Sequence, residues 1–140
     1  MSTPEGFDLN SEKAAVARED EGIVVHITNS KGEPMHFGDG QPVTVTVAGT
    51  YSKRYRDAER ERVDRRFKGR QPNIETIRRD ALEITADCVL AWSGFFDNGK
   101  PLDCIRSNVV KVLDGVPWVR EQVEKAMEDH AGFSRASSAS

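Results

Sequence analysis

Cysteine is scarce in this sequence, with only Cys88 and Cys104 among its 140 residues. Two cysteines cannot form the disulfide framework typical of small secreted proteins, so a reduced cytoplasmic setting is expected. Long apolar runs are missing too, since no stretch approaches the ~18–20 residues of a membrane-spanning helix. Residues 1–20 are acidic and lack the hydrophobic segment of a secretory signal. These absences argue against a secreted or membrane-inserted protein.

Residues that would support catalysis or metal binding are few and scattered. The two cysteines lie sixteen positions apart, with no neighbouring cysteine or histidine at the spacing of a zinc site. The sequence Ser93-Gly94 lacks the flanking glycines of a hydrolase nucleophile elbow, and no glycine-rich phosphate loop precedes a helix. The histidines fall in a strand, a loop and a helix end (His26, His36 and His130). We therefore expect no enzymatic activity, no metal and no cofactor.

Charge is what the sequence has in abundance. Charged residues make up 31% of the chain, above the typical ~25%, whereas hydrophobic residues make up 37%, and the net charge is −3. The length fits one domain of ordinary size. We therefore expect a single small core beneath a strongly charged surface.

Two segments carry the alternating pattern of β-strands. Residues 23–27 place Ile23, Val25 and Ile27 on one face, and residues 43–47 alternate valine with threonine. Between them lie two turn clusters, and residues 35–37 are expected to form a short third strand because a fifteen-residue loop would be unusual in a compact domain. The pattern predicts a small antiparallel β-hairpin or three-stranded meander.

The rest of the chain has mainly helical spacing. One helix is expected from an N-cap at Ser52 to about Lys68, and a second, the most apolar, from an N-cap at Asn73 to about Trp92. The second includes Cys88, which we expect in the core as a small apolar residue. A short helix capped by Ser107 and a last helix beginning at Pro117 follow. The predicted fold class is therefore α+β, with the small sheet followed by a mainly helical bundle of about four helices.

The two ends of the chain are expected to lie outside this domain. Residues 1–21 read as a mobile acidic arm with a weak helix capped by Ser11, because its apolar face holds only alanines and one valine. Residues 134–140 are small and polar and are expected to be disordered. The single α+β domain is thus expected to span residues 22–133.

The predicted helix over residues 53–70 is strongly basic. It holds nine Lys or Arg against four Asp or Glu, an excess of +5 that leaves −8 on the remainder. A basic helix is the electrostatic signature of nucleic-acid binding, but the interleaved acids favour ion pairs three or four residues apart along the helix. Three readings stay open: a solvated salt-bridged face, a docking surface for an acidic protein, and a nucleic-acid surface.

An aromatic cluster is the other informative feature. Trp92, Phe95 and Phe96 lie around the expected end of the most apolar helix, and Trp118 begins the last one. Such residues either close the core where helices meet or anchor a protein partner, since tryptophan is enriched at the energetic centres of interfaces. Phe95 and Phe96, beside a glycine-containing loop, are the part most expected at the surface.

The order of motifs from residue 86 to residue 133 resembles the tail assembly chaperones of long-tailed, siphovirus-like bacteriophages. The similarity lies in a segment ending in Trp-x-Gly (Trp92 to Gly94), an Asp/Gly turn reaching Gly99, Lys-Pro at Pro101, and two further helices. One of these helices is led by Asn108 and the other by Pro117. Upstream, the Gly-Glu-Pro turn at residues 32–34 and the Gly-x-x-Ser at residues 49–52 follow the same order, so the resemblance spans roughly residues 22–133.

The resemblance implies a function in phage tail morphogenesis. Members of this family bind the tape measure protein, keep it soluble and recruit tail tube protein subunits, and they are absent from the finished virion. The resemblance therefore implies a location in the host bacterial cytoplasm. Besides the tape measure and tail tube proteins, a second copy of this chain stays open as a partner. The residues expected to contact partners share an aromatic or apolar side chain (Trp92, Phe95, Phe96, Leu102 and Trp118). Two alternatives are a nucleic-acid-binding accessory protein using residues 53–70 and a structural tail or head-completion protein of the virion.

Overall fold

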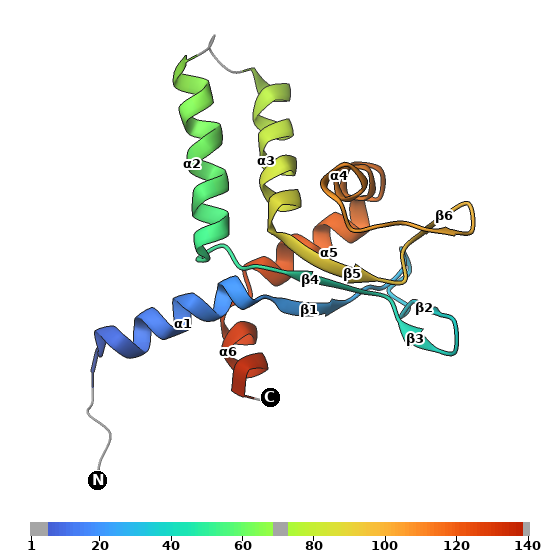
Figure 1. The fold of residues 1–140 in the computed structure, drawn as a ribbon, viewed down its shortest axis with the longest axis horizontal. Coiled ribbons are helices and arrows are strands. Elements are labelled where there is room, and N and C mark those ends of the chain that lie inside the picture. Colours follow the sequence, from blue (N-terminus) through green and yellow to red (C-terminus); the bar gives the residue numbers. More distant parts are fainter. Residues whose placement is uncertain (1–5, 69–72, 139–140) are drawn as a thin grey trace.

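The computed structural model describes residues 6–68 and 73–138, in which helices and short strands are mixed. The helices are α1 (Leu9–Glu21), α2 (Lys53–Lys68), α3 (Ile74–Cys88), α4 (Arg106–Gly115), α5 (Pro117–Met127) and α6 (His130–Ser138). The strands are β1 (Ile23–His26), β2 (His36–Phe37), β3 (Gln41–Pro42), β4 (Thr44–Val47), β5 (Val89–Ser93), β6 (Phe96–Asp97) and β7 (Lys100–Pro101). Figure 1 shows a small central sheet with helices around it, so the predicted α+β class is confirmed.

The central sheet has the order β1-β4-β5, and both pairings are antiparallel. The two strands predicted from alternation pair as expected, with Val25 opposite Val45. The third strand, however, is β5, which the sequence pattern placed inside a helix running to Trp92. Helix α3 ends at Cys88, and Trp92 lies opposite Val45 in the ladder. The spacing of four residues between Cys88 and Trp92 is compatible with a helix. Residues 89–93 nevertheless form a strand, because their backbone groups hydrogen-bond to β4.

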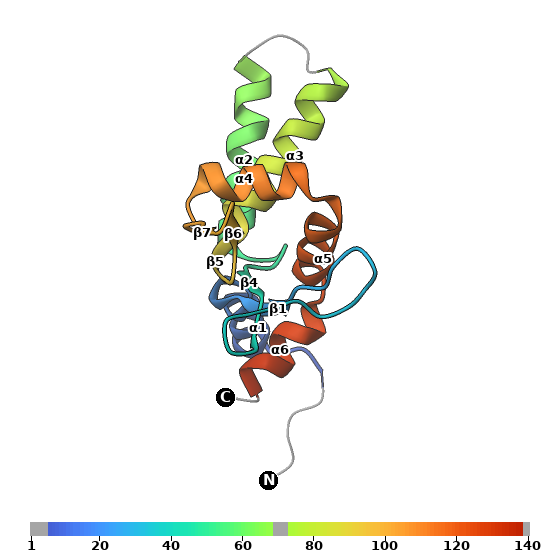
Figure 2. The ribbon, with the colours of Figure 1, turned by 90° about the vertical axis from the view of Figure 1, so that its right-hand side faces the viewer.

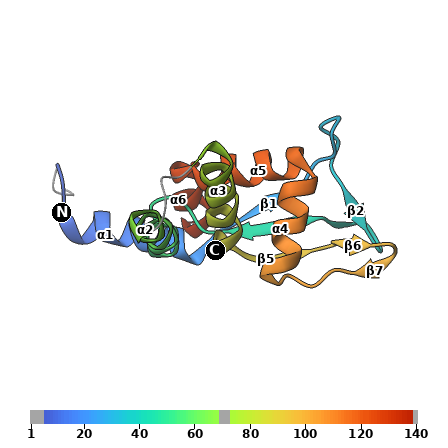
Figure 3. The same cartoon turned by 90° about the horizontal axis from the view of Figure 1, so that it is seen from above.

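Two small hairpins extend the sheet at one end. The predicted strand at residues 35–37 is present as β2, but it pairs with β3 in a separate two-stranded ribbon. The second ribbon joins β6 to β7. Both ribbons lie at the same end of the molecule, as the two views in Figures 1 and 3 agree.

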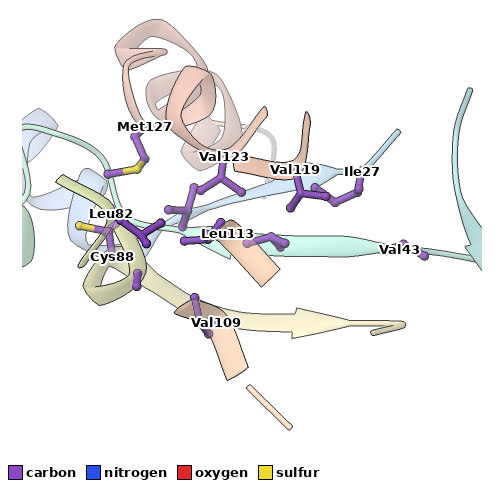
Figure 4. Packing of buried hydrophobic residues seen from close by; sticks show 13 residues of the cluster. Ile27, Val43, Leu82, Cys88, Val109, Leu113, Val119, Val123 and Met127 are labelled. Atoms are coloured by element: carbon purple, nitrogen blue, oxygen red, sulfur yellow. The ribbon is translucent and has the colours of Figure 1, made fainter. Parts of the chain in front are cut away.

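The core lies between one face of the sheet and helices α3, α4 and α5. Its side chains from β4 meet side chains from the three helices, as Figure 4 shows in close-up. Cys88 is fully buried there, as predicted. The members that are most completely enclosed are apolar and mostly β-branched (Ile27, Val45, Val47, Val123 and Met127). Gln122 of α5 also holds the segment that follows β1, because its side-chain amide accepts from the Thr28 backbone N–H at 2.8 Å and donates to the Thr28 carbonyl at 3.0 Å.

Helices α2 and α3 form a hairpin that projects from this body (Figures 1 and 2). Both predicted N-caps are confirmed: the Ser52 hydroxyl accepts from the Tyr55 backbone N–H at 3.0 Å, and the Asn73 side chain accepts from the Thr76 N–H at 2.8 Å. Caps of this kind each stabilise a helix by about 1 kcal/mol. Local sequence signals therefore determine where these two helices begin.

The N-terminal segment differs from the expected weakly docked arm. Its helix is capped by Asp8, whose carboxylate accepts from the Ser11 N–H, so Ser11 is not the cap. Near the other end of α1, the buried Glu19 accepts from the Tyr51 N–H at 3.0 Å, and the Asp20 carboxylate accepts from the first N–H groups of α2. Polar contacts to a helix N-terminus, rather than apolar burial, hold the end of α1 against the body.

The C-terminal segment also differs from the prediction. Residues 134–138, expected to be disordered, continue α6, while residues 139–140 lie outside the described part of the chain. The start of α6 is held by Phe133, which is 2% exposed, and by the Asp129 carboxylate, which accepts from the Gly132 N–H at 3.0 Å. A helix anchored at its first turn can extend through small polar residues that would not nucleate one alone. Within residues 6–68 and 73–138, no helix is both long enough and apolar enough to cross a membrane.

Candidate protein-binding site

The predicted aromatic turn is built by a tight hairpin after β5. Asp97 pairs with Lys100, which leaves Asn98 and Gly99 as a two-residue loop. Both have positive φ, 51° and 80°, as the type I′ turn of a twisted hairpin requires. The Leu102 N–H then donates to the Phe95 carbonyl at 2.8 Å, extending the ladder beyond Pro101. The motif residue Gly99 therefore has a conformational reason to be glycine.

Three of the predicted contact residues are linked next to this hairpin, Trp92 and Phe95 through their rings and Leu102 through its backbone. The Trp92 and Phe95 rings are stacked, with centroids 4.3 Å apart and an interplanar angle of 13°. The Trp92 indole N–H donates to the Leu102 carbonyl at 2.8 Å. All three residues are half-buried, and the Trp92 and Phe95 rings pack against the core while part of their surface stays accessible.

Phe96 is the most exposed of the predicted contact residues. Half of its surface is accessible, and its ring lies 6.1 Å from that of Phe37, tilted by 58°. Phe37, in β2, was not predicted as a site residue, because only the two ribbons meeting in space place it beside Phe96. Gly94 lies against the Phe37 ring: its φ is +84°, and a Cβ there would lie 2.7 Å from Cε1 of Phe37. We call the surface formed by Phe37, Trp92, Phe95, Phe96 and Leu102 the aromatic end.

Trp118 lies apart from the ring pairs of the aromatic end, which are Phe37 with Phe96 and Trp92 with Phe95. It is 40% exposed on the first turn of α5, which begins at Pro117 as predicted. The cap of α4 differs from the prediction: the helix is capped at Ile105 without a side-chain bond, not at Ser107. The motif residue Asn108 instead donates from its side chain to the Asp103 carbonyl at 2.9 Å, which holds the loop before α4.

The basic helix α2 is partly neutralised by carboxylates. Two predicted pairs four residues apart are present, Lys53 with Asp57 at 2.6 Å and Arg65 with Glu61 at 3.7 Å. Arg62 is only 2% exposed and lies against three carboxylates, two of them from α3 (Glu61, Glu83 and Asp87). Part of the positive charge of this helix therefore joins α2 to α3.

A second polar cluster, not predicted from sequence, links the two ends of the chain. Nδ1 of His130 lies 2.7 Å from Oε2 of Glu19, and its ring stacks on Tyr51 with centroids 3.7 Å apart. Gly49 leaves the space that the Glu19 carboxylate occupies. No local signal identifies such a cluster, because Glu19 sits in an acidic run that reads as solvated. The cluster joins α1, α6 and the loop before α2.

The two cysteines are free, and burial raises the pKa of both thiols, to about 12 for Cys88. Both thiols are therefore neutral at physiological pH, and a neutral thiol is a weak nucleophile and a poor metal ligand. In the part of the chain that the structure describes, no group of three or more His, Cys, Asp or Glu is placed to hold a metal ion.

No protein-family model, curated protein or solved structure matches this chain. Its sequence motifs and its own surfaces are therefore what indicate a function. Among the surfaces, the aromatic end combines an exposed ring, a tight hairpin and half-buried supporting rings, and aromatic side chains are enriched in protein interfaces.

Proposed function

We propose that this protein is a non-enzymatic tail assembly chaperone of a long-tailed bacteriophage. In this proposal it binds the tape measure protein in the host cytoplasm, keeps it soluble and recruits tail tube subunits, and it is absent from the mature virion. The observation that carries the proposal is the half-exposed Phe96 on a tight hairpin at the aromatic end. The order of sequence motifs described above supplies the identity of the partners.

The aromatic end has the physical properties that such a task needs. A chaperone for long apolar helices must expose some apolar surface, yet stay soluble and release its client. The exposed Phe96 and its half-buried neighbour Phe37 form a small apolar patch, and the many charged residues of the chain maintain solubility. Trp92, Phe95 and Leu102 hold the hairpin in place, so that little side-chain freedom is lost when a client binds.

Trp118 is proposed as a separate contact. It is exposed on the first turn of α5, and its ring belongs to neither of the two ring pairs of the aromatic end. A chaperone that bridges a tape measure protein and a tube subunit needs more than one surface. We propose that Trp118 contacts the second of these partners.

Co-expression with the tape measure protein tests the proposal, with solubility of the tape measure protein as the readout. Phe96→Ser removes an exposed ring and leaves the Trp92–Phe95 stack intact, so the protein should fold with an unchanged melting temperature but rescue far less tape measure protein. Phe7→Ser is the matched control, because Phe7 is 77% exposed and lies before α1, apart from the aromatic end. It should rescue as well as the wild type.

Two results would contradict the proposal. Equal rescue by the Phe96 and Phe7 variants would show that the aromatic end does not bind the client. Stoichiometric recovery of this chain in purified virions, measured by mass spectrometry, would make it a structural component of the particle instead.

A further inference from the structure

A groove on another face of the molecule is not used by the proposed function. It lies where the α2–α3 hairpin meets α5 and has a volume of about 360 Å³. Helices α2 and α3 each contribute residues at positions i, i+4, i+7 and i+8, and α5 with its C-cap Glu128 has the same spacing, so each presents one continuous face to the groove. On α3 these are Ile77, Ala81, Ile84 and Thr85. Figures 1 and 2 show the hairpin standing above α5, with the ribbons of the aromatic end elsewhere.

The floor of the groove is apolar and partly uncovered. Ile77 is 46% exposed, and Val63 from α2 faces the same groove and is also exposed. Ile84 and Met127 are buried at its base. Along α3, Ile77 to Thr85 spans about 12 Å at ~1.5 Å per residue. This length matches about two turns of a partner helix, which would bury its apolar face along the floor.

The rim of the groove is acidic. Three glutamates line it: Glu59 from α2, Glu124 from α5, and Glu128, which is the C-cap of α5. Arg120 pairs with Glu124 at 2.6 Å, whereas in residues 6–68 and 73–138 neither Glu59 nor Glu128 has a cation within ion-pair distance. The pKa of the Tyr55 hydroxyl, inside the groove, is raised mainly by burial. Repulsion from nearby anions, among them Glu59, Glu128 and Glu124, raises it further.

The other cation of the groove does not offset this charge. Arg62 lines the groove but is directed to Glu83 and Asp87 of α3, with its side chain almost fully buried. Two uncompensated carboxylates thus remain beside an apolar floor. A partner carrying positive charge next to an apolar stripe would complement both features.

We propose that this groove binds an amphipathic helix of a partner protein, with apolar residues on one face and lysine or arginine on both flanks. The apolar face packs on Ile77 and Val63, and the flanking cations pair with Glu59 and Glu128. The proposal goes beyond the chaperone function, because it concerns a different face and a partner defined only by its chemistry.

A second copy of this chain is a poorer occupant. Symmetric pairing through the groove would bring Glu59, Glu124 and Glu128 of one copy close to the same three residues of the other. Such like-charge juxtaposition opposes association and selects for an oppositely charged partner.

Two synthetic peptides of sixteen residues test the proposal by fluorescence anisotropy. Both carry leucine at every third or fourth position, and the flanking positions are lysine in one peptide and glutamate in the other. The lysine peptide should bind the wild type, and its affinity should fall as salt rises. The glutamate peptide should bind at least tenfold more weakly.

Three variants locate the binding site of the lysine peptide. Ile77→Ser should weaken binding about tenfold or more, because an apolar anchor is lost. Ile105→Ser is the matched control, since Ile105 is a similarly exposed isoleucine on a different face, and it should bind as the wild type does. Glu59→Gln with Glu128→Gln keeps side-chain size and should both weaken binding and flatten the salt dependence. Phe96→Ser should change nothing, which separates this groove from the aromatic end.

Four outcomes would overturn the proposal. These are no binding of the lysine peptide to the wild type, equal binding of the two peptides, and equal effects of Ile77→Ser and Ile105→Ser. The fourth is a dimer in light scattering that Ile77→Ser dissociates, because the groove would then be occupied by a second copy. None of them bears on the rescue experiment at Phe96, so the two proposals fail separately.

Discussion

Replacing Gly94 with alanine tests how the aromatic end is assembled. Gly94 has φ +84°, and a Cβ there would lie 2.7 Å from Cε1 of the Phe37 ring. Gly99 offers a matched control, because its φ is +80° but a Cβ there would meet open space. The two substitutions therefore share the backbone strain and differ in the collision with Phe37.

The expected magnitudes follow from these two contributions. A non-glycine residue at positive φ costs about 1–2 kcal/mol, and this applies equally to Gly94→Ala and Gly99→Ala. Overpacking adds about 1–3 kcal/mol at Gly94 alone. We expect Gly99→Ala to lower the free energy of unfolding by about 1–2 kcal/mol and Gly94→Ala to lower it by about 2–5 kcal/mol.

Urea denaturation of the two variants measures this difference. A double-mutant cycle adds the partner: Phe37→Ala removes the ring, so the extra cost of Gly94→Ala should largely disappear in that background. If Gly94→Ala and Gly99→Ala are equally destabilising, Phe37 is not held against Gly94. The same result would remove the reason for treating Phe37 and Phe96 as one surface.

Three further predictions concern stability. Burial raises the pKa of the Cys88 thiol from 9.0 to about 12, so between these values the native state keeps a proton that the unfolded state loses. This thiol should therefore make the free energy of unfolding about 1.4 kcal/mol lower at pH 10 than at pH 8. Urea titrations of Cys88→Ala, which should lack this difference, isolate the contribution. Arg62→Met should cost about 1.5–3 kcal/mol in urea unfolding, because it removes the charged contacts of a buried guanidinium with Glu83 and Asp87, which keep Arg79 and Arg106 as their other partners. The exposed Arg65→Met should cost under about 0.5 kcal/mol. Glu19→Ala should lower the free energy of unfolding by about 1–3 kcal/mol and speed hydrogen exchange of the α1 amides. Glu21→Ala, at an exposed neighbouring position, should do neither. Equal exchange rates in the two variants would refute the anchoring of α1 by Glu19.

The local elements of the fold were largely predictable from the sequence. The alternation of valine and threonine identified β4, and the caps at Ser52 and Asn73 fixed the starts of α2 and α3. The turn around Gly99 was predicted in the same way. These features depend on the conformational preference of a residue and on neighbours within four positions, and a sequence displays both directly.

The candidate surfaces were only half predictable. Phe96 was expected to be exposed and is, but its neighbour Phe37 comes from a strand about sixty residues earlier. The groove joins α2, α3 and α5, whose residues share no sequence signal. Pairings between distant segments depend on the whole packing arrangement, which one sequence does not display.

By itself, then, the sequence determined a small α+β protein with a charged surface, the positions of most helices, and an aromatic turn after residue 92. Only the tertiary structure decided that residues 89–93 form a strand, that α1 is held by a buried carboxylate, and that α6 continues through residues 134–138. The reason is physical. At residues 89–93 the local spacing is compatible with either helix or strand, and hydrogen bonds to β4 made the choice. At Glu19 the cost of burying a charge is offset by partners that lie 32 and 111 residues away.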